Sequence, residues 1–229
     1  MPPPAARPTR RSGPSAPGEL RERILSATRT LLSQRRFETL SVADILAAAQ
    51  VSRASFYFYF PSKQSVLGEL VRQAVAQGQR AAGPWLDGRQ DPVEALRTGI
   101  LDGARLWRDN AGVLTAIVEN LGSDDDLRAL WTGQMDLFTE AAVARISADP
   151  RAREHLGDLN VRAVAAALTW QGERLYYLAA AGVPPFDDQA VLVATLTNAW
   201  TSTLYGETAP LRPAPSGAEQ APEAARAHR

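Results

Sequence analysis

The sequence contains no cysteine and only two histidines, His155 and His228. Without cysteine the chain forms neither disulfides nor thiolate metal sites, and the two histidines do not have a metal-ligand spacing. No apolar run approaches the roughly 18 residues of a membrane span, and the basic N-terminus lacks the apolar segment of a signal peptide. We therefore expect a soluble, cytoplasmic protein without a metal or cofactor.

The sequence also lacks the groups of side chains on which enzymes depend. No nucleophile stands beside a suitable base, and the three carboxylates Asp124–Asp126 lie in a polar stretch that is typical of solvated surface. An enzyme is therefore the least favoured function class.

Strand patterns are missing as well, because no segment sustains an alternation of apolar and polar residues. Helical patterns instead extend between strong breaks such as Gly122-Ser123 and Asp149-Pro150. The sequence predicts an all-α protein with helices at about 19–33, 41–50, 52–60, 62–79, 92–109, 111–121, 125–147, 160–181 and 187–205. We expect the Pro-rich residues 1–18 to form a disordered basic arm and residues 209–229 to form a disordered tail.

Positive charge is concentrated at one end of the chain, although the formal net charge is zero. Residues 1–75 hold 11 basic and 5 acidic side chains, whereas residues 76–229 hold 14 and 20. An excess of cations confined to one segment is typical of proteins that bind polyanions. The N-terminal part is therefore the expected nucleic-acid interface.

Two short helices on either side of Gln50 provide the structural element for this interface. Ser41 and Asp44 resemble a capping box at the start of the first helix, and Ser52 is a suitable N-cap for the second. The turn between them has no glycine, so a left-handed Gln50 would cost on the order of 1 kcal/mol. The pattern predicts a helix-turn-helix, whose second helix lies in the major groove of DNA.

Five consecutive aromatic residues, 56–60, occupy the second helix. No helix face holds five neighbours, so Phe56 and Phe60 share one face and the tyrosines suit a boundary with a polar partner. Lys63, the only lysine, follows at a helix N-terminus, where a bound phosphate would offset the unfavourable helix dipole; a solvated surface lysine is the alternative. The predicted DNA contacts are Ser41, Ser52, Arg53, Ser55, Tyr57, Tyr59 and Lys63.

Residues 52–63 resemble the N-terminal signature of TetR-family transcriptional regulators, and the likeness extends from about Leu20 to Leu70. Segments 96–100, 130–131, 173–176 and 200–207 resemble the ethionamide-resistance repressor branch of that family. The resemblance implies a helix-turn-helix domain over residues 19–65 and a helical effector-binding and dimerisation domain over residues 66–208. It also implies a dimer interface made by the last two helices of each subunit. A dimer is expected independently, because one helix-turn-helix reads too few base pairs and a two-fold dimer reads a palindrome.

Tryptophans and glycines occur together in the C-terminal part. All five tryptophans lie beyond residue 83, and four glycines (Gly99, Gly103, Gly133, Gly172) lie inside predicted helices at a cost of about 1 kcal/mol each. Large rings beside absent side chains indicate either a packed core with close helix crossings or an apolar ligand cavity. The resemblance favours the cavity and implies these ligand contacts: Leu96, Gly103, Trp107, Trp131, Met135, Phe138, Thr169, Gly172, Tyr177 and Trp200.

Three of these positions depart from the branch. It tends to have amide side chains where this chain has Thr169 and Gly172, and an aromatic residue where it has Gly103. We therefore expect a wider cavity with fewer hydrogen bonds to its ligand.

Two function classes remain open. The leading hypothesis is a dimeric repressor that leaves a palindromic operator when an apolar effector displaces the fourth helix and changes the separation of the recognition helices. The alternative is a dimeric DNA-binding regulator without an effector, in which the C-terminal domain serves only dimerisation.

Overall fold

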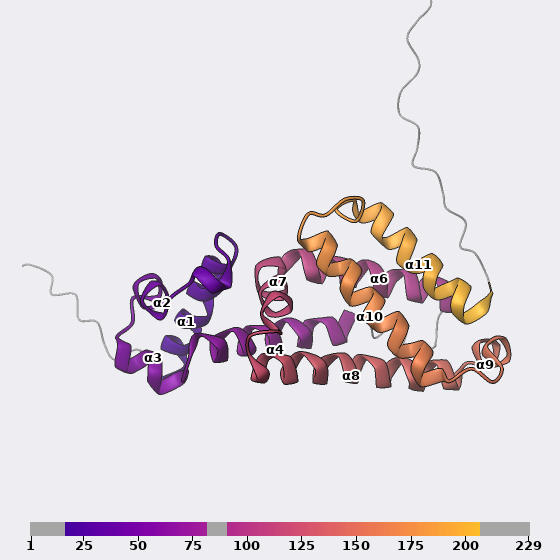
Figure 1. Cartoon of the computed structure of the whole chain (residues 1–229), viewed down its shortest axis with the longest axis horizontal. Coiled ribbons are helices and arrows are strands. Elements are labelled where there is room, and N and C mark those ends of the chain that lie inside the picture. Colours follow the sequence, from indigo (N-terminus) through magenta and orange to yellow (C-terminus); the bar gives the residue numbers. More distant parts are fainter. Residues whose placement is uncertain (1–16, 82–90, 207–229) are drawn as a thin grey trace, which may run out of the picture.

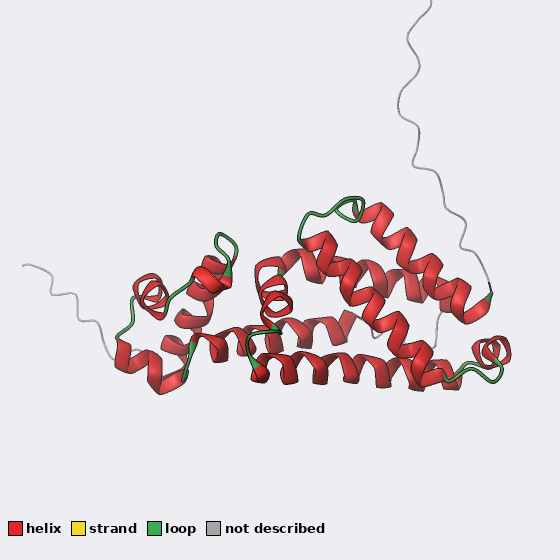
Figure 2. Ribbon diagram, viewed as in Figure 1, coloured by secondary structure: helices red, strands yellow, loops and turns green. Residues whose placement is uncertain are grey.

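The computed structural model describes residues 17–81 and 91–206. Within these ranges the chain forms helices and loops and no strand, which confirms the all-α prediction (Figure 2). The predicted tail lies outside the described residues, as does the predicted arm except for residues 17 and 18, which begin the first helix.

The helices of the N-terminal part are α1 (Pro17–Leu32), the 3-10 turn η1 (Phe37–Thr39), α2 (Val42–Ala49), α3 (Arg53–Tyr59) and α4 (Lys63–Ala81). Those of the C-terminal part are α6 (Pro92–Asp109), α7 (Ala111–Asn120), α8 (Asp125–Ala148), α9 (Pro150–Leu156), α10 (Val161–Ala180) and α11 (Gln189–Tyr205). In Figure 1, α1 to α3 form one end of an elongated molecule, and α4 runs from them into the larger group of helices. Helix α7 lies at the junction of the two parts.

Helix α9 was not predicted from the sequence, in which Asp149-Pro150 was interpreted as a break. The same dipeptide instead starts a helix, because the Asp149 side chain accepts a hydrogen bond from the Arg151 backbone and Pro150 occupies the first turn. Proline is favoured at that position, since its missing N–H would have no intrahelical partner there.

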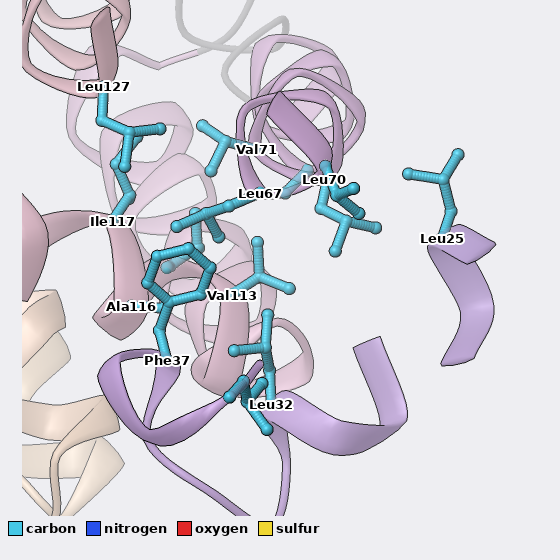
Figure 3. Close-up of a cluster of buried hydrophobic side chains, with 14 of the residues drawn as sticks. Leu25, Leu32, Phe37, Leu67, Leu70, Val71, Val113, Ala116, Ile117 and Leu127 are labelled. Atoms are coloured by element: carbon cyan, nitrogen blue, oxygen red, sulfur yellow. The ribbon is translucent and has the colours of Figure 1, made fainter. Parts of the chain in front are cut away.

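One hydrophobic core extends through both parts of the molecule. Figure 3 shows side chains of the N-terminal part and of α4, α7 and α8 gathered in one cluster, among them Leu32, Phe37, Leu67, Val71, Val113, Ile117 and Leu127. This cluster continues to Trp107, Trp131 and Met135 in the larger part. A second cluster joins α6 and α8 to α11. Because the first core is shared, the position of the helix-turn-helix depends on the packing of the C-terminal helices.

The backbones of α1 and α7 approach each other closely at Gly112. A Cβ atom on this glycine would lie 2.7 Å from the carbonyl carbon of Leu32 and 3.0 Å from the nitrogen of Ser33. Beside this contact, Arg36 Nη2 lies 3.5 Å from the Glu119 carboxylate. The Asn120 amide donates a hydrogen bond of 3.0 Å to Glu38. Helix α7 is therefore a second connection between the two parts, in addition to α4.

Candidate nucleic-acid interface and ligand cavity

The turn between α2 and α3 has the expected helix-turn-helix geometry. At the start of α2 the capping box is present: the Ser41 hydroxyl accepts a hydrogen bond from the Asp44 backbone, and the Asp44 carboxylate accepts one from the Ser41 backbone. Hydrogen bonds from Ser41, together with the nearby Arg35, lower the pKa of Asp44 to about 2. Gln50 has φ 52° and ψ 48°, so the left-handed residue is present.

An arginine of α1 holds this turn in place. Arg23 Nη2 donates hydrogen bonds of 2.6 Å to the carbonyl of Ala49 and 2.8 Å to that of Gln50. These bonds satisfy carbonyl groups at the C-terminus of α2, where a cation is also favourable for the helix dipole. Part of the excess positive charge of the N-terminal segment therefore stabilises the fold.

Helix α3 presents a buried face and an exposed face, as its aromatic run predicted. Phe56 and Phe60 are buried in the core. On the other side, Tyr57 is 47% exposed and Phe58 is 80% exposed. Two aromatic rings exposed to solvent on so short a helix contribute little to the stability of the monomer. This side of α3 is therefore suited to contact a binding partner.

Five of the seven residues predicted to contact DNA lie on α3 or at its N-cap (Ser52, Arg53, Ser55, Tyr57 and Tyr59), whereas Ser41 caps α2 and Lys63 begins α4. Ser52 caps the helix, because its hydroxyl accepts a hydrogen bond of 3.0 Å from the Ser55 backbone. Arg53 is exposed in the first turn. Tyr59 is partly buried, and its ring meets that of Phe58 edge-on with 4.9 Å between the ring centres. Phe58 was not among the predicted contacts, although its place in the aromatic run was visible in the sequence.

Lys63 has an internal role that the sequence did not indicate. Its ammonium donates to the carbonyls of Phe37 at 2.9 Å and Leu40 at 2.7 Å, and lies 3.4 Å from that of Glu38. It also lies 4.5 Å from the centre of the Phe37 ring. Partial burial lowers the pKa of Lys63. A phosphate contact stays a prediction, and it would have to exchange for one of these carbonyl contacts.

The Lys63→Met variant separates the two roles. Methionine keeps an unbranched stem but leaves carbonyls around η1 without their donor, so we expect the free energy of unfolding to fall by about 2 kcal/mol. If Lys63 acts only inside the fold, the slope of log K for DNA against log salt changes by less than about half a unit. A fall of about 0.9 units for each bound subunit, measured on folded protein, would instead show that Lys63 neutralises a phosphate.

A cavity of about 190 Å³ lies where the two hydrophobic cores meet. Nine of the ten predicted ligand positions line it, namely Leu96, Gly103, Trp107, Trp131, Met135, Phe138, Thr169, Gly172 and Trp200. Within it, the rings of Trp107 and Trp131 meet edge-on at 6.0 Å between centres. Gly99, in the cavity wall, has no atom beyond its chain neighbours and its own helix backbone within 4 Å of the place where its Cβ would lie. The cavity therefore combines aromatic side chains with open space beside a glycine, which is the arrangement that the cavity hypothesis describes.

Tyr177 does not line the cavity. Its hydroxyl donates to Glu119 of α7 at 3.4 Å, and the Arg174 guanidinium lies 5.1 Å from its ring centre. Glu119 also pairs with Arg36, so Tyr177 belongs to the polar contacts at the junction with the DNA-binding part.

The extra space expected at Gly103 is filled. A Cβ atom there would lie 2.7 Å from the hydroxyl oxygen of Tyr176, which donates to the carbonyl of Ile100 at 3.1 Å. The Tyr176 ring also stacks on Trp107 at 6.2 Å between centres. The expectation of a wider cavity was wrong at this position, because the neighbouring helix supplies the ring that α6 lacks.

Glu173 is a cavity residue that was not predicted as a ligand contact. It lies in the wall of the cavity and is 5% exposed. Trp131 Nε1 donates to its Oε1 atom at 3.4 Å, and Arg174 Nε lies 4.0 Å from Oε2. Burial raises the pKa of Glu173. The signals in the sequence were its place one residue after Gly172 in an apolar helix and its place in segment 173–176, which resembles the ethionamide-resistance repressor branch.

Within the described ranges, no three His, Asp or Glu side chains come together as a metal site would require. Among the same residues, no helix has both the length and the apolar character to cross a membrane.

Two family models match the chain in the regions that carry these sites. Residues 24–70 match the bacterial regulatory proteins of the tetR family, and residues 96–206 match the C-terminal domain of the transcriptional regulator EthR. The chain is 29% identical over 198 residues to the HTH-type transcriptional regulator EthR of Mycolicibacterium smegmatis, covering 86% of this chain and 91% of that protein. It is 29% identical over 186 residues to EthR of Mycobacterium tuberculosis, covering 80% and 86%.

Solved structures share the fold at lower identity. A TetR-family regulator from Syntrophomonas wolfei superimposes with a TM-score of 0.66 at 16% identity, covering 82% of this chain and 96% of that one. Salmonella enterica GusR superimposes with a TM-score of 0.63 at 19% identity, covering 83% and 98%. We conclude from the helix-turn-helix, the helical C-terminal part and the two family matches that the chain belongs to the TetR family of DNA-binding transcriptional regulators, is not an enzyme, and has a C-terminal domain of the EthR type.

Proposed function

We propose that the protein is a cytoplasmic, dimeric repressor that an apolar small molecule releases from a palindromic operator. The observation that carries this proposal is the position of the cavity. It borders the core that is shared with the helix-turn-helix, and its wall includes Val75 of α4 and Leu114 of α7. These are the two helices that connect the cavity to the DNA-binding part.

A ligand in this cavity can change the position of the recognition helices through the shared core. Filling the space moves α4 or α7 against the shared core, and α3 is attached to that core by Phe56 and Phe60. The ligand shifts the population only by its preference for the conformation that does not fit the operator. The relatives named as transcriptional regulators support this proposal.

The dimer is proposed to form through the outer faces of α10 and α11. Trp170 on α10 and Val191 on α11 are both 39% exposed. The exposed Ala163 and Ala167 lie on the same face of α10 as Trp170, seven and three residues before it. Large apolar groups among small ones on two neighbouring helices allow another pair of helices to approach closely.

The Trp170→Glu variant tests this face. A buried, unpaired carboxylate at a dimer interface costs several kcal/mol, so we expect the dimer to dissociate at micromolar concentration. Sedimentation velocity gives the oligomeric state. The Leu137→Glu variant is the control, because Leu137 is 54% exposed on α8. If Trp170→Glu remains as dimeric as the control variant, the interface lies elsewhere.

The operator is found by selecting duplexes from a random pool with the full chain. We expect a palindromic sequence, bound with a steep salt dependence because phosphate contacts release counterions. Fluorescence anisotropy then follows release of the selected duplex as apolar compounds are added. Release by a compound that also changes tryptophan fluorescence supports the repressor with an effector. Saturation of the cavity without any release favours the regulator whose C-terminal domain serves only dimerisation.

A further inference from the structure

We infer that the cavity takes an amphiphile with a cationic amine, and that Glu173 is the residue that selects it. This inference rests on the proposed function, in that it names the chemical class of the effector. It contrasts with the expectation of a purely apolar ligand, and it follows from the hydrogen bonding of the cavity wall.

The donors of three polar side chains in the wall are already used inside the protein. The Trp131 indole donates to Glu173, the Tyr176 hydroxyl to the Ile100 carbonyl, and the Thr169 hydroxyl to the Ala165 carbonyl at 2.7 Å. The Tyr176 and Thr169 hydroxyl oxygens can still accept a hydrogen bond from a ligand, whereas the indole is a donor only. Together with the Glu173 carboxyl group, these two oxygens suit a ligand that brings its own hydrogen-bond donor.

Glu173 is the acceptor with the largest unmet capacity. Among the described residues of the cavity wall, it is the only one with an acidic or basic side chain. A carboxylate accepts about four hydrogen bonds. Glu173 has one long hydrogen bond of 3.4 Å from Trp131. A carboxylate buried with so few partners is costly, and the cost is relieved when the group is protonated or when a cationic ligand completes its shell.

Arg174 does not complete this shell. Its Nε atom lies 4.0 Å from Glu173 Oε2, which is beyond hydrogen-bond distance, and its side chain is 56% exposed. The guanidinium instead lies over the Tyr177 ring, outside the cavity. The Glu173 carboxyl is thus held in an apolar cavity with no cation of the protein at hydrogen-bond distance, and an ammonium on the ligand would supply one.

The aromatic surroundings favour the same chemistry. Trp107, Trp131 and Tyr176 form a continuous group of rings in the wall, with Trp107 in contact with both of the others. The faces of such rings attract cations, most strongly when water is excluded. A protonated amine on a short alkyl chain therefore finds an acceptor, a set of rings and an apolar space in one site.

Three probes of equal chain length test this inference: n-octylamine, n-octanol and n-octanoate. Each is titrated into the full chain without DNA, and binding is followed by tryptophan fluorescence and by calorimetry. We expect the dissociation constant for n-octylamine to be about tenfold or more below that for n-octanol, with n-octanoate the weakest, because a charge-assisted hydrogen bond is stronger than a neutral one.

The Glu173→Gln variant keeps the size of the side chain and an oxygen that can accept from Trp131. We expect it to bind n-octanol as the unaltered protein does and to lose the preference for n-octylamine, leaving the two constants within about threefold. Glu140→Gln is the matched control, because Glu140 lies on α8, pairs with Arg162 and is not in the cavity wall. It makes the same change in net charge and should keep the full preference.

Three results would overturn the inference: equal or tighter binding of n-octanol by the unaltered protein, an unchanged preference in Glu173→Gln, or no binding of any probe. The first needs no variant, so a poorly folded Glu173→Gln leaves the test intact. Release of the selected duplex by n-octylamine is measured separately. Tight, Glu173-dependent binding without release supports the inference on ligand class and counts against the proposed function alone.

Discussion

The Gly112→Ala variant is expected to lose about 3 kcal/mol of folding free energy and to bind DNA weakly. The added Cβ atom would lie 2.7 Å from the carbonyl carbon of Leu32 and 3.0 Å from the nitrogen of Ser33, and backbone atoms have no rotamer by which to give way. Overpacking of this kind typically costs 1–3 kcal/mol, so about 3 kcal/mol is the upper part of that range. To relieve the clash, α7 has to move away from α1.

That movement affects the DNA-binding part because the junction contains further contacts. Arg36 pairs with Glu119, and Glu38 accepts a hydrogen bond from Asn120. Arg36 and Glu38 lie beside or within η1, and Glu119 and Asn120 are the last two residues of α7. A displaced α7 weakens these contacts and opens the core that holds the helix-turn-helix. We therefore expect the affinity for the selected duplex to fall together with the stability.

Gly133→Ala is the matched control for this prediction. Gly133 lies inside α8, and no atom beyond its chain neighbours and its own helix backbone lies within 4 Å of the place of an added Cβ. Alanine there should stabilise the protein by about 0.5–1 kcal/mol through helix propensity. Thermal denaturation at one fixed protein concentration measures both variants. If Gly112→Ala is as stable as Gly133→Ala, the backbones of α1 and α7 are not in close contact at Gly112.

The Arg53→Ala variant is expected to bind the selected duplex about 100-fold more weakly while binding random DNA within about threefold of the unaltered protein. Arg53 is exposed in the first turn of α3, the part of a recognition helix nearest the base edges. One bidentate contact of arginine to guanine contributes about 1–3 kcal/mol of discrimination, and a dimer makes two. Phosphate contacts, by contrast, contribute equally on all sequences.

Arg128→Ala removes the same charge without touching the recognition helix. Arg128 lies on α8, where it pairs with Asp125 and donates to the Leu121 carbonyl. Competition anisotropy with labelled operator and unlabelled random duplex measures the specificity ratio of each variant. We expect the ratio to be unchanged in Arg128→Ala. An equal loss of affinity for operator and random DNA in Arg53→Ala would exclude base reading by this residue.

Local sequence patterns predicted the helices well where each end had its own signal. The predicted helix 92–109 has the bounds of α6, because Asp91 caps it and Pro92 fixes its first turn. Ser41, Asp44 and Ser52 likewise located the two helices of the helix-turn-helix. The same kind of signal at Asp149 and Pro150 was interpreted as the end of a helix, since one dipeptide is compatible with both.

Contacts between distant segments could not be predicted. Whether Lys63 reaches solvent or the carbonyls of η1 depends on how α4 packs beside η1, which no local pattern encodes. Tyr176 and Tyr177 are neighbours on α10, and about 100° of helix rotation decides which one enters the cavity. A resemblance assigned the ligand role to Tyr177, whereas the structure places Tyr176 in the wall. Glu173 was missed because a carboxylate in an apolar helix looks, from sequence alone, like a surface residue.

The exposed face of α3 is expected to lie against duplex DNA, and a DNA-cleaving reagent attached to that face gives the most direct test. The chain has no cysteine, so the Phe58→Cys variant carries a single attachment site at a position that is 80% exposed. Leu137→Cys, on α8, is the control. We predict that the Phe58→Cys conjugate cuts the selected duplex in two major-groove segments about one helical turn apart, and that the Leu137→Cys conjugate does not cut there. Equal cutting by both conjugates, or none from Phe58→Cys in a complex that still forms, would contradict this expectation.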